Sequence, residues 1–173
     1  MALSRKQPGP PADLLPGCNA LDTMIAMCAP KTLLSVSLQS SPDAVRDVLA
    51  RVAQTVAAAG QNPTATNNIE LAMAEALNNV VEHSFHETAK GQILVEITLD
   101  EDVFCISIRH DGTPMPGMRL PEGRPANVGV DSANLPEGGF GWFLIRSLVL
   151  DAAYTHRDNW SELVLRFARL PEG

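Results

Sequence analysis

The chain contains 173 residues, of which 45% are hydrophobic and 19% are charged, and its formal net charge is −7. This length predicts a single domain with a substantial core. The acidic balance argues against a nucleic-acid surface, because phosphate binding needs clustered basic side chains and the only Lys/Arg run is Arg5-Lys6. No apolar run approaches the length of a transmembrane helix. We therefore expect neither nucleic acid nor a membrane among the partners.

Residues 1–30 are rich in Pro, Gly and small polar residues and show no periodicity, which predicts a flexible tail ahead of a domain at residues 31–170. The prolines interrupt any apolar core that a secretion signal would need. The three cysteines, Cys18, Cys28 and Cys105, have no paired spacing, and Cys105 falls within an apolar strand pattern. An odd number without a disulfide framework indicates a reducing compartment, so we expect a cytoplasmic protein in which Cys105 is a core thiol.

The first part of the domain predicts one strand and two helices. Residues 31–39 alternate apolar and polar side chains, as a strand with one buried face does. Ser41 and Pro42 then provide a hydroxyl cap and a first-turn proline for a helix that stops near Gly60. A second helix is expected over residues 65–84.

The second part of the domain predicts two strands, a long irregular connection, an apolar helix and two closing strands. These elements are expected over residues 92–99, 103–109, 111–138, 140–150, 152–156 and 163–168. The resulting order is β-α-α-β-β-loop-α-β-β. It predicts an α+β fold, a two-layer sandwich with helices on one face of a sheet.

Three polar side chains at steps of four residues mark the second predicted helix. Glu75, Asn79 and His83 would form one stripe, since residues i and i+4 lie above one another on a helix. A neighbouring apolar stripe consists of Ile69, Met73, Ala76, Leu77 and Val80. The polar stripe is therefore expected at the rim of a buried face, within reach of a ligand. The alternatives are an ordinary surface pair for Glu75 and Asn79, and for His83 a histidine that simply favours the helix C-terminus.

A glycine-rich segment opens the last predicted helix. Gly138, Gly139, Phe140 and Gly141 leave backbone N–H groups accessible at the positive end of the helix dipole. Such a segment binds phosphate, because the glycines let the backbone approach the anion closely. The alternative is a glycine-rich turn ahead of a core helix, whose aromatic residues are expected to be buried.

A third polar segment follows the strand predicted at residues 103–109 and reads His110-Asp111-Gly112. A carboxylate at such a strand end can accept a hydrogen bond from the amino group of adenine. Gly112 would let the base lie against the backbone. This segment is therefore a candidate for reading the base of a nucleotide.

The three segments together resemble the ATPase domain shared by gyrase, the Hsp90 chaperones, histidine kinases and MutL. They are most similar to its short branch of anti-sigma-factor serine kinases, and the resemblance covers about residues 31–168. It implies the GHKL, or Bergerat-type, fold with a mixed, mostly antiparallel sheet. It also implies binding of ATP and Mg²⁺, kinase activity towards a serine of a STAS-type anti-anti-sigma protein, inhibition of a sigma factor, and a homodimer.

The same resemblance implies roles for individual residues. Glu75 corresponds to the general base and Asn79 to the magnesium ligand, and His83 also matches the family block. Further nucleotide contacts are implied for Arg124 in a lid over the phosphates, for Gly138, Gly139, Phe140 and Gly141 in the glycine block, and for Ser161 near the adenine.

One residue departs from the family pattern. The adenine-reading block of the family is Asp-x-Gly, and alignment on Gly112 places His110 at the position of the aspartate. Asp111 lies one residue further along a strand end, where its side chain would turn to the other side unless the backbone bulges. Neutral His110 can still accept one hydrogen bond from the adenine amino group. Two hypotheses stay open: an ATP-dependent serine kinase, and a partner-switching binding module of the same fold that has lost efficient phosphotransfer or nucleotide.

Overall fold

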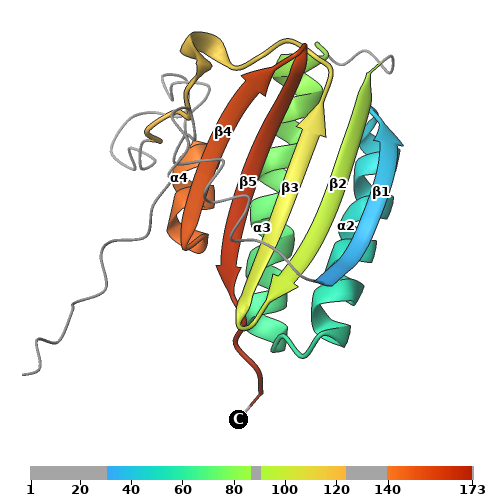
Figure 1. The fold of residues 1–173 in the computed structure, drawn as a ribbon, viewed down its shortest axis with the longest axis vertical. Coiled ribbons are helices and arrows are strands. Elements are labelled where there is room, and N and C mark those ends of the chain that lie inside the picture. Colours follow the sequence, from blue (N-terminus) through green and yellow to red (C-terminus); the bar gives the residue numbers. More distant parts are fainter. Residues whose placement is uncertain (1–30, 87–90, 124–139, 173) are drawn as a thin grey trace, which may run out of the picture.

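The computed structural model describes residues 31–86, 91–123 and 140–172. Five strands form one sheet in the order β1-β2-β3-β5-β4, and helices lie on one face of it (Figure 1). The strands are β1 (Lys31–Gln39), β2 (Gln92–Asp100), β3 (Val103–His110), β4 (Asp151–Arg157) and β5 (Trp160–Ala168). The predicted α+β architecture in two layers is confirmed.

Each pair of neighbouring strands in this sheet is antiparallel, so the expectation of a mixed sheet is wrong. Tight turns reverse the chain between β2 and β3 and between β4 and β5, whereas longer segments that carry the helices join β1 to β2 and β3 to β4. The turn between β4 and β5 places Asp158 and Asn159 at positive φ, 52° and 64°. Two such residues in succession are typical of a type I′ hairpin, which matches the twist of the flanking strands.

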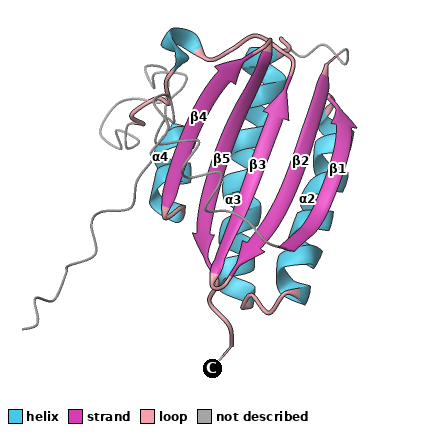
Figure 2. Cartoon of the chain, in the orientation of Figure 1, coloured by secondary structure: helices cyan, strands magenta, loops and turns pink. Residues whose placement is uncertain are grey.

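Three α-helices cover the same face of the sheet (Figure 2): α2 (Pro42–Ala58), α3 (Pro63–Asn79) and α4 (Phe140–Leu148). The hydrophobic core fills the space between the two layers. Alternate residues of β3, namely Phe104, Ile106 and Ile108, are fully buried there. The apolar stripe predicted on α3 belongs to the same core and is buried as expected: Ile69, Met73, Ala76, Leu77 and Val80. Burying each large apolar side chain contributes about 1.5–3 kcal/mol, and this anchors α3 to the sheet.

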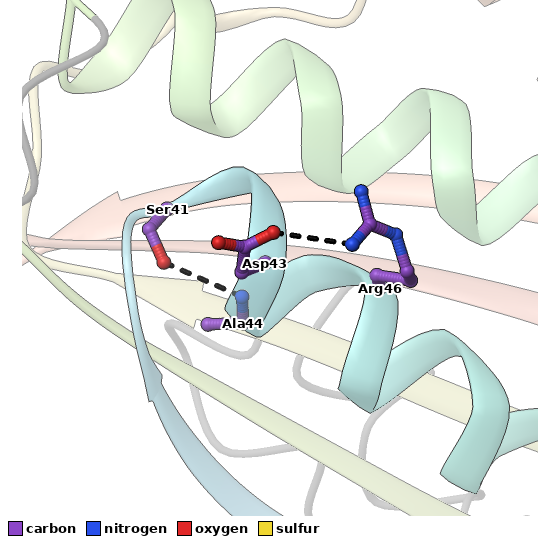
Figure 3. Close-up of polar contacts among 4 residues, drawn as sticks. All are labelled: Ser41, Asp43, Ala44 and Arg46. Carbon is purple, nitrogen blue, oxygen red and sulfur yellow. Dashed lines mark hydrogen bonds and ion pairs between the residues drawn. The ribbon is translucent and has the colours of Figure 1, made fainter.

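The predicted start of α2 is confirmed by its cap. Ser41 has extended backbone angles, and its Oγ accepts a hydrogen bond from the Ala44 N–H at 3.3 Å (Figure 3). Asp43 in the first turn pairs with Arg46 at 3.1 Å. Such a cap satisfies one of the N–H groups that the first turn of a helix leaves unpaired. Asn62 does the same for α3, since its Oδ1 accepts from the Ala65 N–H at 2.8 Å.

The end of α3 differs from the prediction. One helix was expected over residues 65–84, but α3 ends at Asn79 and continues as a π-helix, η1 (Val80–Ser84). A π-turn is wider than an α-turn, so it changes which backbone groups are available at the helix end. The carbonyl oxygen of Ser84 accepts a hydrogen bond from the Thr113 N–H at 2.9 Å. The helix end is thereby joined to the segment that follows β3.

Several smaller expectations also need correction. Helix α4 ends at Leu148, two residues earlier than expected, and β5 begins at Trp160 rather than at residue 163. Of the two aromatic residues expected in the core next to the glycine block, Trp142 is buried but Phe143 is 39% exposed. Cys105 is buried but takes part in a disulfide bond, so the expectation of a free core thiol is wrong. The cysteine argument for a reducing compartment therefore does not hold for this residue.

The predicted tail, residues 1–30, lies outside the described residues. Within the ranges given above, none of the helices is long and apolar enough to cross a membrane.

Candidate nucleotide-binding site

Glu75 and Asn79 lie against the first turn of α4. Both side chains are half-buried on α3. A Cβ atom added to Gly141 would lie 2.5 Å from Glu75 Oε2 and 3.8 Å from Asn79 Nδ2. Position 141 therefore requires glycine if the Glu75 carboxylate is to stay where it is. The fold thus brings together two of the three predicted segments, which are far apart in the sequence.

The amide of Asn79 is available to a ligand. Its Nδ2 is buried and has no hydrogen-bond partner within the described residues. Leaving such a group unpaired costs about 1–3 kcal/mol, so a ligand that pairs with it is favoured. Rotation of the amide by a half-turn exchanges its nitrogen and oxygen, so the same place can offer a donor to a phosphate or an oxygen to a cation.

A metal ion at this place would depend on Asn79 together with oxygens of the ligand itself. Among the side chains that the structure places, no group of three or more His, Cys, Asp or Glu residues could hold a metal ion. Mg²⁺ commonly binds in this manner, through one or two protein oxygens, water and substrate phosphates. The residues present therefore fit a Mg²⁺–nucleotide complex, and they do not form a cage for a free ion.

The segment after β3 runs back beside α4. Arg146 Nε donates a hydrogen bond to the carbonyl oxygen of Pro121 at 3.0 Å. A Cβ atom at Gly123 would lie 2.6 Å from the backbone nitrogen of Phe143, and Gly123 has a φ of +72° that favours glycine. These two contacts hold the segment that precedes the predicted lid against α4.

Five other predicted contact residues gain no support from the described part of the chain. Arg124, Gly138 and Gly139 lie outside the described residues. Phe140, the first residue of α4, is exposed. His83 lies within the π-helix and is exposed as well. The structure therefore places Glu75, Asn79 and Gly141 close together. The functional roles of all these residues stay predictions.

A second group of polar residues lies at the end of β3. His110 faces the helices and is 1% exposed, and its ring lies edge-on to that of Phe85 with 5.8 Å between centroids. His110 Nδ1 is buried, and nothing in the described part of the chain forms a hydrogen bond with it. Ser161 on β5 is directly opposite in the strand register and is fully buried.

His110 is uncharged at neutral pH. Burial lowers its pKa from 6.5 to about 4, because a charged imidazolium would lose its hydration. The nearby Asp111 carboxylate opposes this shift and His156 adds to it. The ring therefore offers one donor and one acceptor nitrogen.

Asp111 does not take the place of the missing aspartate. Its side chain is exposed, and Oδ1 accepts a hydrogen bond from the Gln92 N–H at 2.9 Å, where β2 begins. The register between β2 and β3 continues to His110 without a bulge, so successive side chains point to opposite faces. The nucleotide contact predicted for Asp111 consequently gains no support from its position.

The hydroxyl of Ser161 belongs to a partly buried hydrogen-bond network. Tyr154 OH lies 2.9 Å from Ser161 Oγ, and His156 Nδ1 lies 3.1 Å from it. The Tyr154 hydroxyl also accepts from the Met115 N–H at 2.9 Å. The sequence analysis did not identify Tyr154 or His156. Alternation along β4 could have placed the two on one face, but only the register with β5 brings them to Ser161.

Gly112 joins the end of β3, where the base of a nucleotide is predicted to bind, to the end of η1. A Cβ atom here would lie 2.7 Å from the Ser84 carbonyl oxygen and 2.8 Å from Phe85 Cε1. The glycine therefore lets the turn after β3 close onto the end of η1. Position 112 therefore has a structural reason for glycine in addition to the predicted approach of a nucleotide base.

Fold and site together define the class of protein. Residues 38–167 match the family of the histidine kinase-like ATPase domain, and the chain belongs to this family. The fold prediction made from the three sequence segments is thereby confirmed.

Two relatives refine the comparison. The chain is 27% identical over 135 residues to the serine-protein kinase RsbW of Listeria monocytogenes, which covers 78% of this chain and 86% of that protein. It is 28% identical over 102 residues to RsbW of Bacillus cereus. That match covers 58% of this chain and 62% of the relative. The predicted resemblance to this branch of the family is confirmed.

A solved structure shows the same fold. The RsbU and RsbW domains of Rv1364c from Mycobacterium tuberculosis align with a TM-score of 0.56 at 20% identity, over 81% of this chain. The match spans about a third of that longer chain, 33%. At this identity the likeness concerns the fold alone.

Proposed function

We propose that this chain is an anti-sigma regulatory factor that binds ATP and Mg²⁺ and phosphorylates a serine of a STAS-type anti-anti-sigma protein. The observation that carries the proposal is the contact of Glu75 and Asn79 with Gly141 at the start of α4. The relatives named serine-protein kinase RsbW support this type of reaction. By analogy with the family, the proposal includes a sigma factor as the second partner, a homodimer and a cytoplasmic location.

The first turn of α4 and Asn79 would bind the phosphates. Backbone N–H groups at a helix N-terminus are unpaired and carry partial positive charge, so they stabilise anions. Asn79 would hold Mg²⁺ through its side-chain oxygen, and the cation would neutralise phosphate charge when bound. The buried, unpartnered amide of Asn79 fits this role.

Glu75 would act as the general base. Its carboxylate would accept the proton of the substrate serine as the serine oxygen forms a bond to the γ-phosphorus. The bond between the γ-phosphorus and the bridging oxygen breaks, and ADP leaves with the electron pair. Gly141 allows the carboxylate to lie directly against the helix start, where the γ-phosphate would be held.

Substitutions in α3 test the proposal. Glu75→Gln should bind ATP within a few-fold of wild type but lose phosphotransfer by about 10²–10⁴-fold, because only the proton acceptor is removed. Asn79→Ala should lose Mg²⁺-dependent ATP binding, measured by calorimetry. Asn78→Ala is the matched control, since Asn78 is an exposed neighbour on the same helix. The kinase proposal fails if wild type phosphorylates no candidate protein and both variants behave as wild type does.

A second candidate function is a binding module that sequesters its partner without using nucleotide. His110, at the position of the family's aspartate, is the observation that favours it, because a neutral imidazole lacks the charge of a carboxylate. Calorimetry on wild type and His110→Asp separates the two. Binding by wild type that Asn79→Ala abolishes supports the kinase, whereas binding that appears only in His110→Asp supports the module.

A further inference from the structure

The base end of the site presents a hydrogen-bonding group that differs in kind from a carboxylate. An ionised carboxylate only accepts hydrogen bonds, whereas a neutral imidazole nitrogen accepts or donates according to the tautomer. His110 Nδ1 is buried on the helix side of the sheet, and no group in the described ranges is bonded to it. Its hydrogen-bonding capacity is therefore unused among the described residues, and a ligand that reaches it could pair with it in either sense.

The polar side chains next to His110 in the described ranges leave the role of its Nδ1 open. The tautomer of a histidine is commonly set by the hydrogen bonds around its ring. The Ser161 hydroxyl, opposite in the register, is already bonded to Tyr154 and His156. The Asp111 carboxylate is bonded to the Gln92 N–H. Neither group therefore imposes a donor or an acceptor at His110 Nδ1.

We infer that His110 allows the base site to bind purines that carry either an amino group or an oxo group at carbon 6. Its Nδ1 would accept from the 6-amino group of adenine in one tautomer and donate to the 6-oxo group of hypoxanthine or guanine in the other. The inference rests on the proposed nucleotide-binding function and adds 6-oxopurine nucleoside triphosphates to its ligands. His110 is in this sense a specificity-determining residue.

The charge state of the ring is consistent with both tautomers. Burial lowers the pKa of His110 to about 4, with the Asp111 carboxylate acting against the shift and His156 in favour of it. A protonated ring would donate from both nitrogens and would reject the adenine amino group. At neutral pH the uncharged ring retains both possibilities.

The experiment compares ATP with inosine triphosphate, which carries an oxo group at carbon 6 and lacks the additional 2-amino group of guanosine triphosphate. Affinities of the full chain for both nucleotides are measured by calorimetry with Mg²⁺ present. Wild type should bind the two within about fivefold of each other. His110→Asp should prefer ATP by about 10- to 100-fold, because a carboxylate faces the 6-oxo group without a hydrogen to donate.

His110→Asn is the matched control. Asparagine has nearly the shape of aspartate, but its amide can turn to offer either a donor or an acceptor. This variant should therefore keep the wild-type ratio of affinities, within about fivefold. A purely structural role for His110 would alter both affinities together and would leave the ratio unchanged in the Asp variant as well.

The outcomes separate the inference from the proposed function. If wild type binds ATP but binds inosine triphosphate more than about 30-fold more weakly, the inference is wrong and nucleotide binding stands. An unchanged ratio in His110→Asp also overturns the inference. If wild type binds neither nucleotide, the proposed function fails and the inference fails with it. Thermal melting without nucleotide shows whether each variant is folded, and the wild-type ratio tests the inference even if one variant is not.

Discussion

The two ends of the candidate site differ in how closely they follow the family pattern. At the proposed phosphate end, Glu75 and Asn79 lie close to Gly141 and have the residue types that the resemblance predicts. At the proposed base end, a buried neutral His110 occupies the position where the resemblance predicts an aspartate. Phosphate transfer requires a proton acceptor and close backbone approach, which few residue types provide. Reading a base requires only a suitable hydrogen bond and shape, so the residue there can change more freely.

His110, at the proposed base end, should make the stability of the fold depend on pH. The pKa of His110 is about 4 in the folded chain, lowered mainly by burial, and near 6.5 when unfolded. The unfolded state therefore binds more protons between these values, so stability is lost as pH falls from 6.5 to 4. The loss is on the order of 3 kcal/mol. It is measured by urea denaturation of wild type against His110→Asn, which cannot titrate.

Other groups also titrate in this range, so the test is the difference in the free energy of unfolding between wild type and His110→Asn. Wild type should lose stability relative to His110→Asn as the pH falls through the window. Parallel curves for the two proteins would contradict the assignment of a depressed pKa to His110.

At the proposed phosphate end, a change of side-chain shape should lower phosphotransfer without lowering the stability of the fold. Gly141→Ala would place a methyl group 2.5 Å from Glu75 Oε2, and we expect phosphotransfer to fall by about 100-fold. Stability should not fall, because alanine is favoured over glycine in a helix by about 1 kcal/mol. Ser147→Ala, at an exposed position on the same helix, is the control for activity and melting temperature. Full activity in Gly141→Ala would show that the Glu75 contact is not required.

A substitution in the turn after β3, which contacts the end of η1, should instead lower the stability of the fold. Gly112→Ala would bring a methyl group to 2.7 Å from the Ser84 carbonyl and 2.8 Å from Phe85. We expect a loss of about 2 kcal/mol in the free energy of unfolding, as overpacking commonly causes. Adding Phe85→Leu should restore only part of it, because the backbone carbonyl remains in the way. Complete restoration in the double variant would mean that the ring alone opposes the methyl group.

The smallest effect is expected far from both ends, at the cap of α2. Ser41→Ala should cost about 1 kcal/mol of stability, because the Ala44 N–H loses its acceptor. Nucleotide affinity should not change. Asp43→Ala removes an exposed ion pair, so it should change stability by less than about 0.5 kcal/mol. A change in nucleotide affinity in either variant would show that the cap of α2 influences the nucleotide site from a distance.

Local patterns in the sequence predicted most of the elements. The strand at residues 31–39 and the start of α2 agree with the structure, because alternation and capping act over a few neighbouring residues. The end of α3 was predicted wrongly: the chain continues as a π-helix, whose last residue, Ser84, lies against the turn at Gly112, and helical periodicity does not reveal such a distant neighbour. The exposure of Phe143 was missed for a similar reason: a strongly apolar helix does not reveal which side lacks a neighbour.

The sequence by itself determined which chemical groups the site contains and the spacing of Glu75 and Asn79 on one helix, because helical periodicity is a local property. It also showed that position 110 departs from the family pattern. The tertiary structure alone decided that Gly141 meets Glu75, and that Tyr154 and His156 meet Ser161. These contacts join distant segments, and they depend on strand register and helix packing, which no short stretch of sequence specifies.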